Sequence, residues 1–372
     1  MSLSVEQVGR RAVGACILTV LAGTMPQPGL LGQSIIDVPD PGLGVPLVEF
    51  HSLGPVLDST GAAKVFPGPP TSAVALRDGS LLLSVTAIGA PIYRVNVEGR
   101  MIGTVPIRFK SIVRIAALKG DSIAVWDQGS NSLLVLDPHF KEVRRGRIPF
   151  SAANSLVSPD GTHIVNQAYV LTPAFAGMPF HLFDTKGRYL KSFGQMGSFR
   201  ANRNGAVQPR PLAASSLGIV AGRVDHYEIE SWSLSGELRY TLTRTASWFP
   251  GRPVSVPRRG EAPPTLFSAI HEDANGLIST AVLVPAKDLP KFQGGKAGDP
   301  LPIEDWGDLW DTRVECLDMT RHEVVAAGRI HGTAVLFVGD HTIIGRRPVP
   351  GGWTVVLWSF SLPDVSSTGG PS

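Results

Sequence analysis

An all-β fold built from repeated four-stranded units is predicted by three features of this 372-residue sequence. Gly (41) and Pro (31) are frequent while 43% of residues are hydrophobic, which is typical of many short strands joined by turns. Short apolar runs alternate with turns rich in Asp, Asn and Gly. The same order of strands and turns recurs loosely along most of the chain. Helical bundles and coiled coils are excluded, because their periodicities are missing.

The N-terminus has the pattern of a secretory signal peptide. Arg10 and Arg11 precede an uncharged, mostly apolar run over residues 12–24. This run is too short to span a bilayer, which takes about 20 residues. We therefore expect an extracytoplasmic protein, periplasmic or secreted, with no membrane span in the mature chain.

Composition also predicts how the whole chain is organised. Only Cys316 would remain after removal of a signal that contains Cys16, so the fold does not depend on an internal disulfide. The predicted organisation is a signal peptide or apolar segment (1–24), a Gly/Pro-rich linker (25–46), a repeat domain (47–362) and a disordered tail (363–372).

One repeat stands out between Ser111 and Pro149. Three apolar strands, 111–118, 122–126 and 132–136, are separated by turns, and a fourth leaves over 142–148. Five weaker copies follow or precede it, and insertions lengthen the later ones. Six copies of four strands predict a six-bladed β-propeller; seven blades is the weaker alternative.

The sixth copy lacks a fourth strand. The run Leu47 to His51 is a spare strand at the start of the domain. We predict that this N-terminal strand completes the last blade and closes the ring, because closure leaves fewer open sheet edges.

A family resemblance rests on these repeats. The stretch IAVWDQGSNSLLVLD (Ile123 to Asp137) resembles the NHL-type repeat, and VALRDGSLLLS (Val74 to Ser84) and WDTRVECLD (Trp310 to Asp318) look like related bacterial six-bladed β-propellers. The resemblance implies a fold rather than an activity. Asp127 and Asp137 match recurring aspartates of the repeat, and we expect them to accept backbone hydrogen bonds in turns.

Motifs that carry chemistry are mostly absent. The sequence has no G-x-S-x-G elbow, no phosphate loop and no Cys-x-x-Cys, and its histidines are scattered. No cofactor or metal is predicted, and catalytic residues are unknown. The net charge of +3 is small, so nucleic acid is not an expected partner.

The long loops are expected on one face of the ring and the short Asp-Gly and Asn-Gly turns on the other. Blocks of charge and loop tryptophans mark the long-loop face as a candidate binding surface. The candidate binding residues are Arg200, Arg203, Arg252, Arg258, Arg259, Trp248, Asp305, Trp306, Asp308, Trp310, Arg346 and Arg347.

The sequence supports three hypotheses about function. The favoured one is a non-catalytic, extracytoplasmic scaffold that binds a protein or a small polar ligand, and a separate one is a sensor or subunit in an envelope complex. The alternative is a lactonase-like or strictosidine-synthase-like propeller hydrolase, which needs a metal in the central channel. The first strands of the repeats consist mostly of apolar or small residues and offer few metal ligands, which favours the scaffold over the hydrolase.

Overall fold

The computed structural model describes residues 34–40, 45–148, 154–168, 178–194, 210–251, 255–289 and 296–362. The predicted signal peptide (1–24) and tail (363–372) lie outside these residues.

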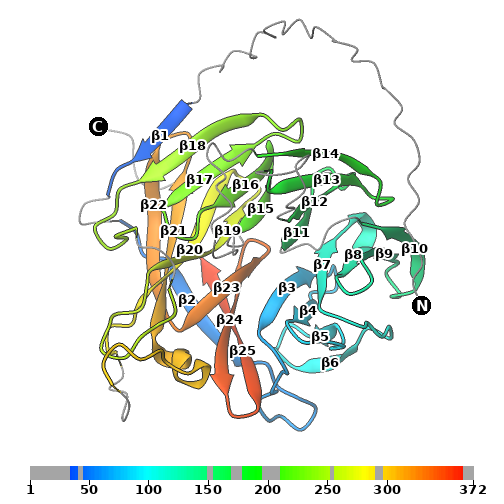
Figure 1. Ribbon diagram of the computed structural model, residues 1–372, viewed down its shortest axis with the longest axis horizontal. Helices are drawn as coiled ribbons and strands as arrows, with labels where there is room; N and C mark the ends of the chain where they lie inside the picture. Colours follow the sequence, from blue (N-terminus) through cyan, green and yellow to red (C-terminus); the bar gives the residue numbers. More distant parts are fainter. Residues whose placement is uncertain are drawn as a thin grey trace, which may run out of the picture. The chain divides into compact units, whose positions relative to one another are not determined.

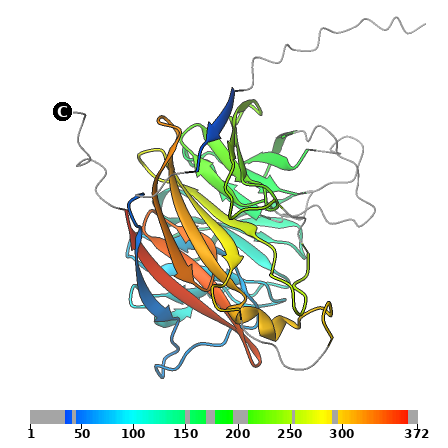
Figure 2. The same cartoon turned by 90° about the vertical axis from the view of Figure 1, so that its left-hand side faces the viewer.

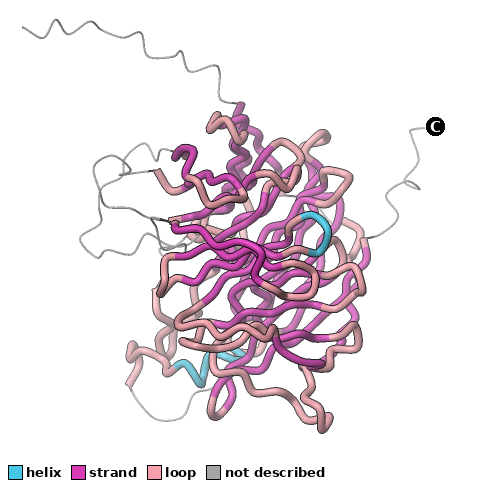
Figure 3. The backbone as a smooth tube through the Cα atoms, turned by 90° about the vertical axis from the view of Figure 1, so that its right-hand side faces the viewer, coloured by secondary structure: helices cyan, strands magenta, loops and turns pink. Residues whose placement is uncertain are grey.

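Six sheets follow one another around a ring in chain order and form a six-bladed β-propeller (Figure 1), as predicted. The described chain is almost entirely strand and loop (Figure 3), with two short 3-10 helices, η1 (Lys119–Asp121) and η2 (Ile303–Asp308). Strands β3, β7, β11, β15, β19 and β23 are the innermost of their blades (Figure 1).

The first three blades each take their four strands from one continuous stretch of chain. Blade 1 contains β3 (Pro70–Ala75), β4 (Leu81–Val85), β5 (Tyr93–Val95) and β6 (Met101–Thr104). Blade 2 contains β7 (Val113–Ala117), β8 (Ile123–Asp127), β9 (Ser132–Leu136) and β10 (Glu142–Arg147). Blade 3 contains β11 (Asn154–Val157), β12 (His163–Gln167), β13 (Phe180–Asp184) and β14 (Tyr189–Phe193).

The last three blades involve the N-terminal segment. Blade 4 contains β15 (Leu212–Ser215), β16 (Gly218–Gly222), β17 (Glu228–Trp232) and β18 (Leu238–Arg244), with β1 (Ser34–Val38) added outside β18. Blade 5 contains β19 (Leu266–Glu272), β20 (Leu277–Pro285), β21 (Trp310–Asp318) and β22 (Glu323–His331). Blade 6 contains β23 (Thr333–Val338), β24 (Thr342–Val349), β25 (Gly352–Ser361) and β2 (Glu49–Pro55).

The hydrophobic core is divided among the seams between neighbouring blades. Strand side chains alternate between the two faces of a blade, so each blade packs against both neighbours. Trp126, Trp232 and Trp358 each lie in a strand, and all three are buried in these seams. Burying an aromatic side chain of this size is worth about 2–3 kcal/mol.

Aspartates shape the tight turns. The Asp137 carboxylate accepts hydrogen bonds from the backbone N–H groups of His139 and Lys141, both at 2.9 Å. Asp127 accepts one from the N–H of Gly129 and another from the Ser111 hydroxyl. This confirms that these aspartates act within turns, where a short carboxylate replaces the missing backbone partner.

The N-terminal strand closes the ring. Strand β2 pairs antiparallel with β25, with Phe50 opposite Phe360 and His51 opposite Ser359. The fourth strand that blade 6 lacks is therefore supplied from the start of the domain, as predicted, although β2 extends to Pro55.

The stretch predicted as a linker (25–46) contains a further strand. Strand β1 runs parallel to β18, with Ser34 opposite Tyr240 and Val38 opposite Arg244. The β-branched residues of SIIDV favour an extended conformation, and Val38 is fully buried. The prediction of a linker, which relied on the Gly and Pro content of the stretch, therefore missed this strand.

Residues 34–40 and 45–55 together form an N-terminal belt on the outer edges of blades 4, 5 and 6 (Figure 2). Between β1 and β2, the N–H of Val48 donates to the Ala327 carbonyl of β22 at 3.0 Å. Gly328 permits this close approach, because a Cβ there would lie 2.5 Å from the Phe50 ring. The belt covers sheet edges that would otherwise be open.

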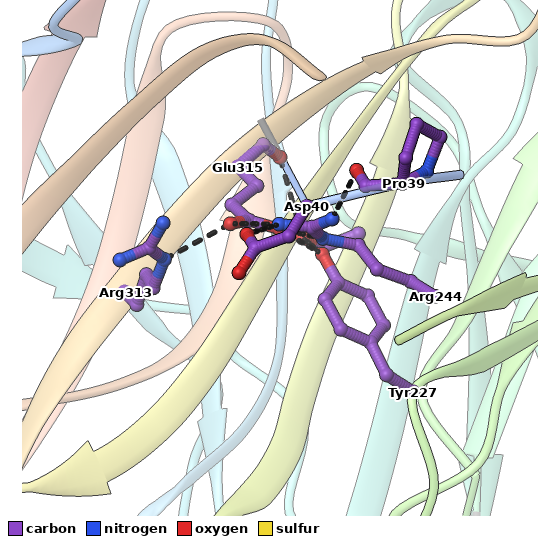
Figure 4. Close-up of polar contacts among 7 residues, drawn as sticks. Pro39, Asp40, Tyr227, Arg244, Arg313 and Glu315 are labelled. Atoms are coloured by element: carbon purple, nitrogen blue, oxygen red, sulfur yellow. Dashed lines mark hydrogen bonds and ion pairs between the residues drawn. The ribbon is translucent and has the colours of Figure 1, made fainter. Parts of the chain in front are cut away.

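A buried polar cluster between blades 4 and 5 anchors the belt (Figure 4). The guanidinium of Arg244 contacts Glu315 at 2.7 Å and donates to the Pro39 carbonyl at 2.7 Å. It also reaches Asp40 at 3.1 Å. The Tyr227 hydroxyl donates to Glu315 at 2.9 Å. Burial, together with the Glu315 charge, raises the pKa of Tyr227 well above its usual value.

Candidate binding site in the central channel

The two faces of the ring carry different connections. Because the strands of each blade are antiparallel, turns between first and second strands and between third and fourth strands lie at one end. Turns such as Asp78-Gly79 and Lys186-Gly187 belong to that end. The loops from β18 to β19 and from β20 to β21 lie at the other end, which we call the long-loop face. The structure thus has the predicted division of long and short connections.

The β18–β19 and β20–β21 loops pair with each other. Arg258 forms an isolated β-bridge with Pro300, and its side chain donates to the Gly298 carbonyl at 2.7 Å. The side chain of Arg259 lies 3.7 Å from the carboxylate of Asp305. Several of the predicted binding charges therefore hold the two loops together. Arg200, Arg203 and Arg252 lie outside the described residues.

The loop tryptophans are more buried than the sequence suggested. Trp310, expected in a loop, is the first residue of β21 and is buried, and its indole N–H donates to the Pro264 carbonyl. Trp306 is half-buried and packs edge-on against Trp310. Trp248 is half-buried under the Arg313 guanidinium, 4.6 Å from its ring centroid. The three rings are packing groups as much as exposed binding groups.

Arg346 and Arg347, two of the candidate binding residues, lie within strand β24 and not in a loop, because the hairpin is longer than its apolar core. Arg347 is exposed and forms an ion pair with Asp308 at 3.0 Å. Arg346 lies on the opposite side of the strand, lines the central channel and sits over the Trp353 ring at 5.3 Å. These neighbours in sequence therefore have different surroundings.

The innermost strands enclose a cavity of about 750 Å³ along the axis of the ring. Its lining changes along its length. Thr71, Arg114, Ser155 and Ser268 lie early in their strands, close to the long-loop face, and Arg346 lies opposite the first residue of β23. The later positions are mostly small or apolar, among them Ala75, Ala117, Val157, Ala214 and Val338. One end of the channel is thus polar and cationic.

The two channel arginines have no carboxylate partner among the described residues. Arg114 donates to the Thr71 carbonyl at 2.8 Å, while its Nε is buried without a hydrogen bond. Burial lowers the pKa of Arg114 to about 10 and also lowers that of Arg346. Both remain charged at neutral pH. None of the described residues that line the cavity is Asp or Glu.

This lining does not fit a channel metal of the kind a propeller hydrolase needs. Hard divalent cations take several carboxylate or carbonyl oxygens, whereas the side chains at the polar end are arginines, hydroxyls and Asn154. Nowhere in the described ranges do three or more His, Cys, Asp or Glu side chains gather in a way that could hold a metal ion.

Reasoning from the sequence missed Arg114, Asn154 and Ser155. Strand β11 was not recognised, because its four residues are flanked by a Ser-Pro-Asp-Gly turn and carry little apolar pattern. Arg114 had a usable signal: it is the one charged residue in the apolar run SIVRIAAL. A charge inside an innermost strand has only the channel or a seam to occupy.

Comparisons with known proteins identify the fold. A solved structure of a member of the DUF4221 family from Bacteroides vulgatus superposes with a TM-score of 0.56 at 10% identity, covering 86% of this chain and 99% of that one. A Bacteroides fragilis protein that is named as exported superposes with a TM-score of 0.56 at 10% identity, covering 88% and 100%. The chain shares their fold. No family profile matches the sequence, and no curated protein matches it.

These similarities show the propeller fold, and the NHL-type resemblance remains an expectation. None of the helices in the described part of the chain is both long and apolar enough to cross a bilayer.

Proposed function

We propose that this protein is an extracytoplasmic, non-catalytic β-propeller that binds an anionic ligand or an acidic protein partner at its long-loop face. The observation that carries the proposal is the cationic end of the channel. Arg114 and Arg346 line one cavity at that end, and neither has a carboxylate partner among the described residues.

The physical argument concerns unpaired charge. A partly buried guanidinium without a counter-ion loses hydration and gains little in return, which the lowered pKa values of both arginines reflect. An anion in the cavity would compensate the charge of the two guanidinium groups. The low dielectric constant of the cavity walls would strengthen the attraction between the anion and the arginines. The charge pattern of the cavity therefore favours anions over cations or neutral molecules.

The proposed extracytoplasmic location rests on the sequence of residues 1–24. It is compatible with the name of the Bacteroides fragilis neighbour, which describes that protein as exported. A fusion of residues 1–46 to an alkaline phosphatase that needs disulfides for activity tests it. Phosphatase activity in intact cells, lost when Arg10, Arg11 and the apolar run are deleted, is the expected outcome. An inactive fusion would contradict export.

The binding function is tested with a fluorescent decaglutamate peptide and with a panel of acetate, citrate and inorganic phosphate. We expect at least one of these probes to bind, and to bind more weakly as salt rises. Arg346→Gln removes a channel charge and should weaken binding about tenfold. Arg347→Gln is the matched control, because it removes the same charge one residue away, outside the channel. Equal effects of the two variants, or no binding of any probe, would contradict the proposal.

A further inference from the structure

Unsatisfied polar atoms gather in the seam between blades 2 and 3. Buried polar side-chain atoms almost always have a hydrogen-bond partner in a folded protein. Seven such atoms in the described residues have none, and five of them belong to residues of blades 2 and 3. The five are Arg114 Nε, Trp126 Nε1, Ser155 Oγ, Asn166 Nδ2 and Asn166 Oδ1.

The strand register brings these groups together. Arg114 lies opposite Trp126 in blade 2, and Ser155 lies opposite Asn166 in blade 3. Trp126 packs in one cluster with Ile164 and Ala168 of blade 3. Because strand side chains alternate, Asn166 points to the same side of blade 3 as Ile164. Trp126 and Asn166 therefore face each other across the seam, and Arg114 lies beside them on the channel side, where its guanidinium also donates to the Thr71 carbonyl of blade 1.

On blade 3 these residues are part of a polar row that crosses all four strands. Asn166 lies opposite His181, which lies opposite Ser192. In the outer half of the row, His181 Nε2 donates to the Ala168 carbonyl at 3.0 Å, so His181 Nδ1 accepts from the Ser192 hydroxyl at 2.6 Å. Only the inner half, Ser155 and Asn166, has unpaired polar atoms. The polar side chains on the outer strands of this row are thus hydrogen-bonded, whereas those on the two strands nearest the channel have polar atoms without partners.

The inner half lies next to the channel. Arg114 and Ser155 line the cavity, and the fully buried Asn166 and Trp126 lie one strand behind them. A small group in the cavity beside Arg114 would meet the hydroxyl of Ser155, and the amide of Asn166 lies in the next strand, opposite Ser155.

We propose that this pocket, formed by Arg114, Trp126, Ser155 and Asn166, binds the carboxylate group of a small molecule. The inference rests on the proposed function and names the chemistry of its ligand. Arg114, Trp126 and the Asn166 amide can only donate from their unpaired nitrogens, and the hydroxyl of Ser155 can donate as well, so Asn166 Oδ1 is the one atom of the five that can only accept. A set made mostly of donors fits an acceptor with two oxygens. Arg114 supplies a single positive charge, which a carboxylate neutralises and a doubly charged phosphate would exceed.

The test uses the full chain labelled with 5-fluorotryptophan. The protein has seven tryptophans, and Trp126→Phe assigns the 19F resonance of Trp126. Titration with acetate should shift that resonance in a saturable way. Acetamide, which has the same shape without the charge, should not, and inorganic phosphate should bind about tenfold more weakly or not at all.

Two serines on innermost strands provide matched variants. Ser155→Ala removes an unpaired hydroxyl from the pocket, whereas Ser268→Ala removes a cavity-lining hydroxyl that already donates to the Ala281 carbonyl at 2.9 Å. We expect Ser155→Ala to weaken acetate binding by about fivefold to tenfold and Ser268→Ala to leave it unchanged. Asn166→Leu should abolish the shift while the far-ultraviolet circular dichroism stays that of the unmodified chain.

Three results would overturn the proposal: no saturable shift of Trp126 with acetate, an equal shift with acetamide, or equal effects of Ser155→Ala and Ser268→Ala. Each of these can occur while decaglutamate or citrate still binds in a manner that depends on Arg346. The failure of the carboxylate pocket is therefore distinguishable from failure of the proposed function.

Discussion

Two seams of the same ring treat buried polar groups in opposite ways. Between blades 4 and 5, Arg244, Glu315 and Tyr227 satisfy one another and hold the N-terminal belt. Between blades 2 and 3, Arg114 and Asn166 keep polar atoms without partners, next to the channel. A satisfied network stabilises and orders the fold, whereas an unsatisfied one costs stability unless something else completes it. The difference separates a structural cluster from a candidate binding site.

The largest effect should come from removing the belt that the satisfied seam anchors. A chain lacking residues 1–52 loses β1 and most of β2, which exposes the edges of β18 and β25. We expect the loss of a large part of the total stability, which is about 5–15 kcal/mol for folded domains. Removal of residues 364–372 serves as the control and should change little. Melting temperatures measure both, and equal values would contradict ring closure as a source of stability.

The next effect concerns the buried ion pair itself. Glu315→Leu leaves the Arg244 side chain buried without its main partner and should cost about 3–5 kcal/mol of unfolding free energy. The double variant Arg244→Met with Glu315→Leu should recover much of this loss, because no fully buried charge is left unpaired: the side chains of Arg313 and Asp40, which lose a partner, are 32% and 46% exposed. Urea unfolding of the three proteins gives the values. A single variant as stable as the unmodified chain would show that Glu315 does not hold this seam together.

A matched pair of hydroxyl deletions compares the two seams directly. Tyr227→Phe removes a hydroxyl bonded to Glu315 and Thr280 and should destabilise by about 1–2 kcal/mol. Ser155→Ala removes a hydroxyl with no partner and should leave stability within about 0.5 kcal/mol or raise it slightly. The midpoints of denaturant unfolding for the two variants, each compared with that of the unmodified chain, measure the two stability changes. A comparable loss in both variants would mean that the blade 2/3 seam is satisfied in solution without a ligand.

The smallest expected effect concerns the chemical reactivity of the Cys316 thiol and not the stability of the fold. Cys316 is fully buried in blade 5, and burial raises the pKa of its thiol to about 11. Thiolate is the reactive form, so Cys316 should not react with a disulfide reagent at pH 8 in the native protein. In a Cys16→Ser background, one thiol should become reactive on unfolding in guanidinium. Rapid reaction of the native protein would show that blade 5 opens easily.

Local patterns in the sequence determined the architecture. Apolar runs such as 122–126 and 132–136 became strands, and Asp137 shaped its turn, because period-two burial and turn chemistry act within a few residues. The spare strand near Leu47 was assigned to the last blade because an incomplete sheet needs a partner. These inferences needed no knowledge of distant contacts.

Tertiary structure alone decided the site. Arg346 and Arg347 look alike in the sequence, but alternation in β24 places one in the channel and the other beside Asp308. Nothing in the sequence indicates that Trp126 and Asn166 lie on the two sides of one seam, since they belong to different blades, which meet only through packing. Whether a buried polar atom has a partner depends on residues far away along the chain, so the sequence fixes which groups exist and the fold fixes which are left unpaired.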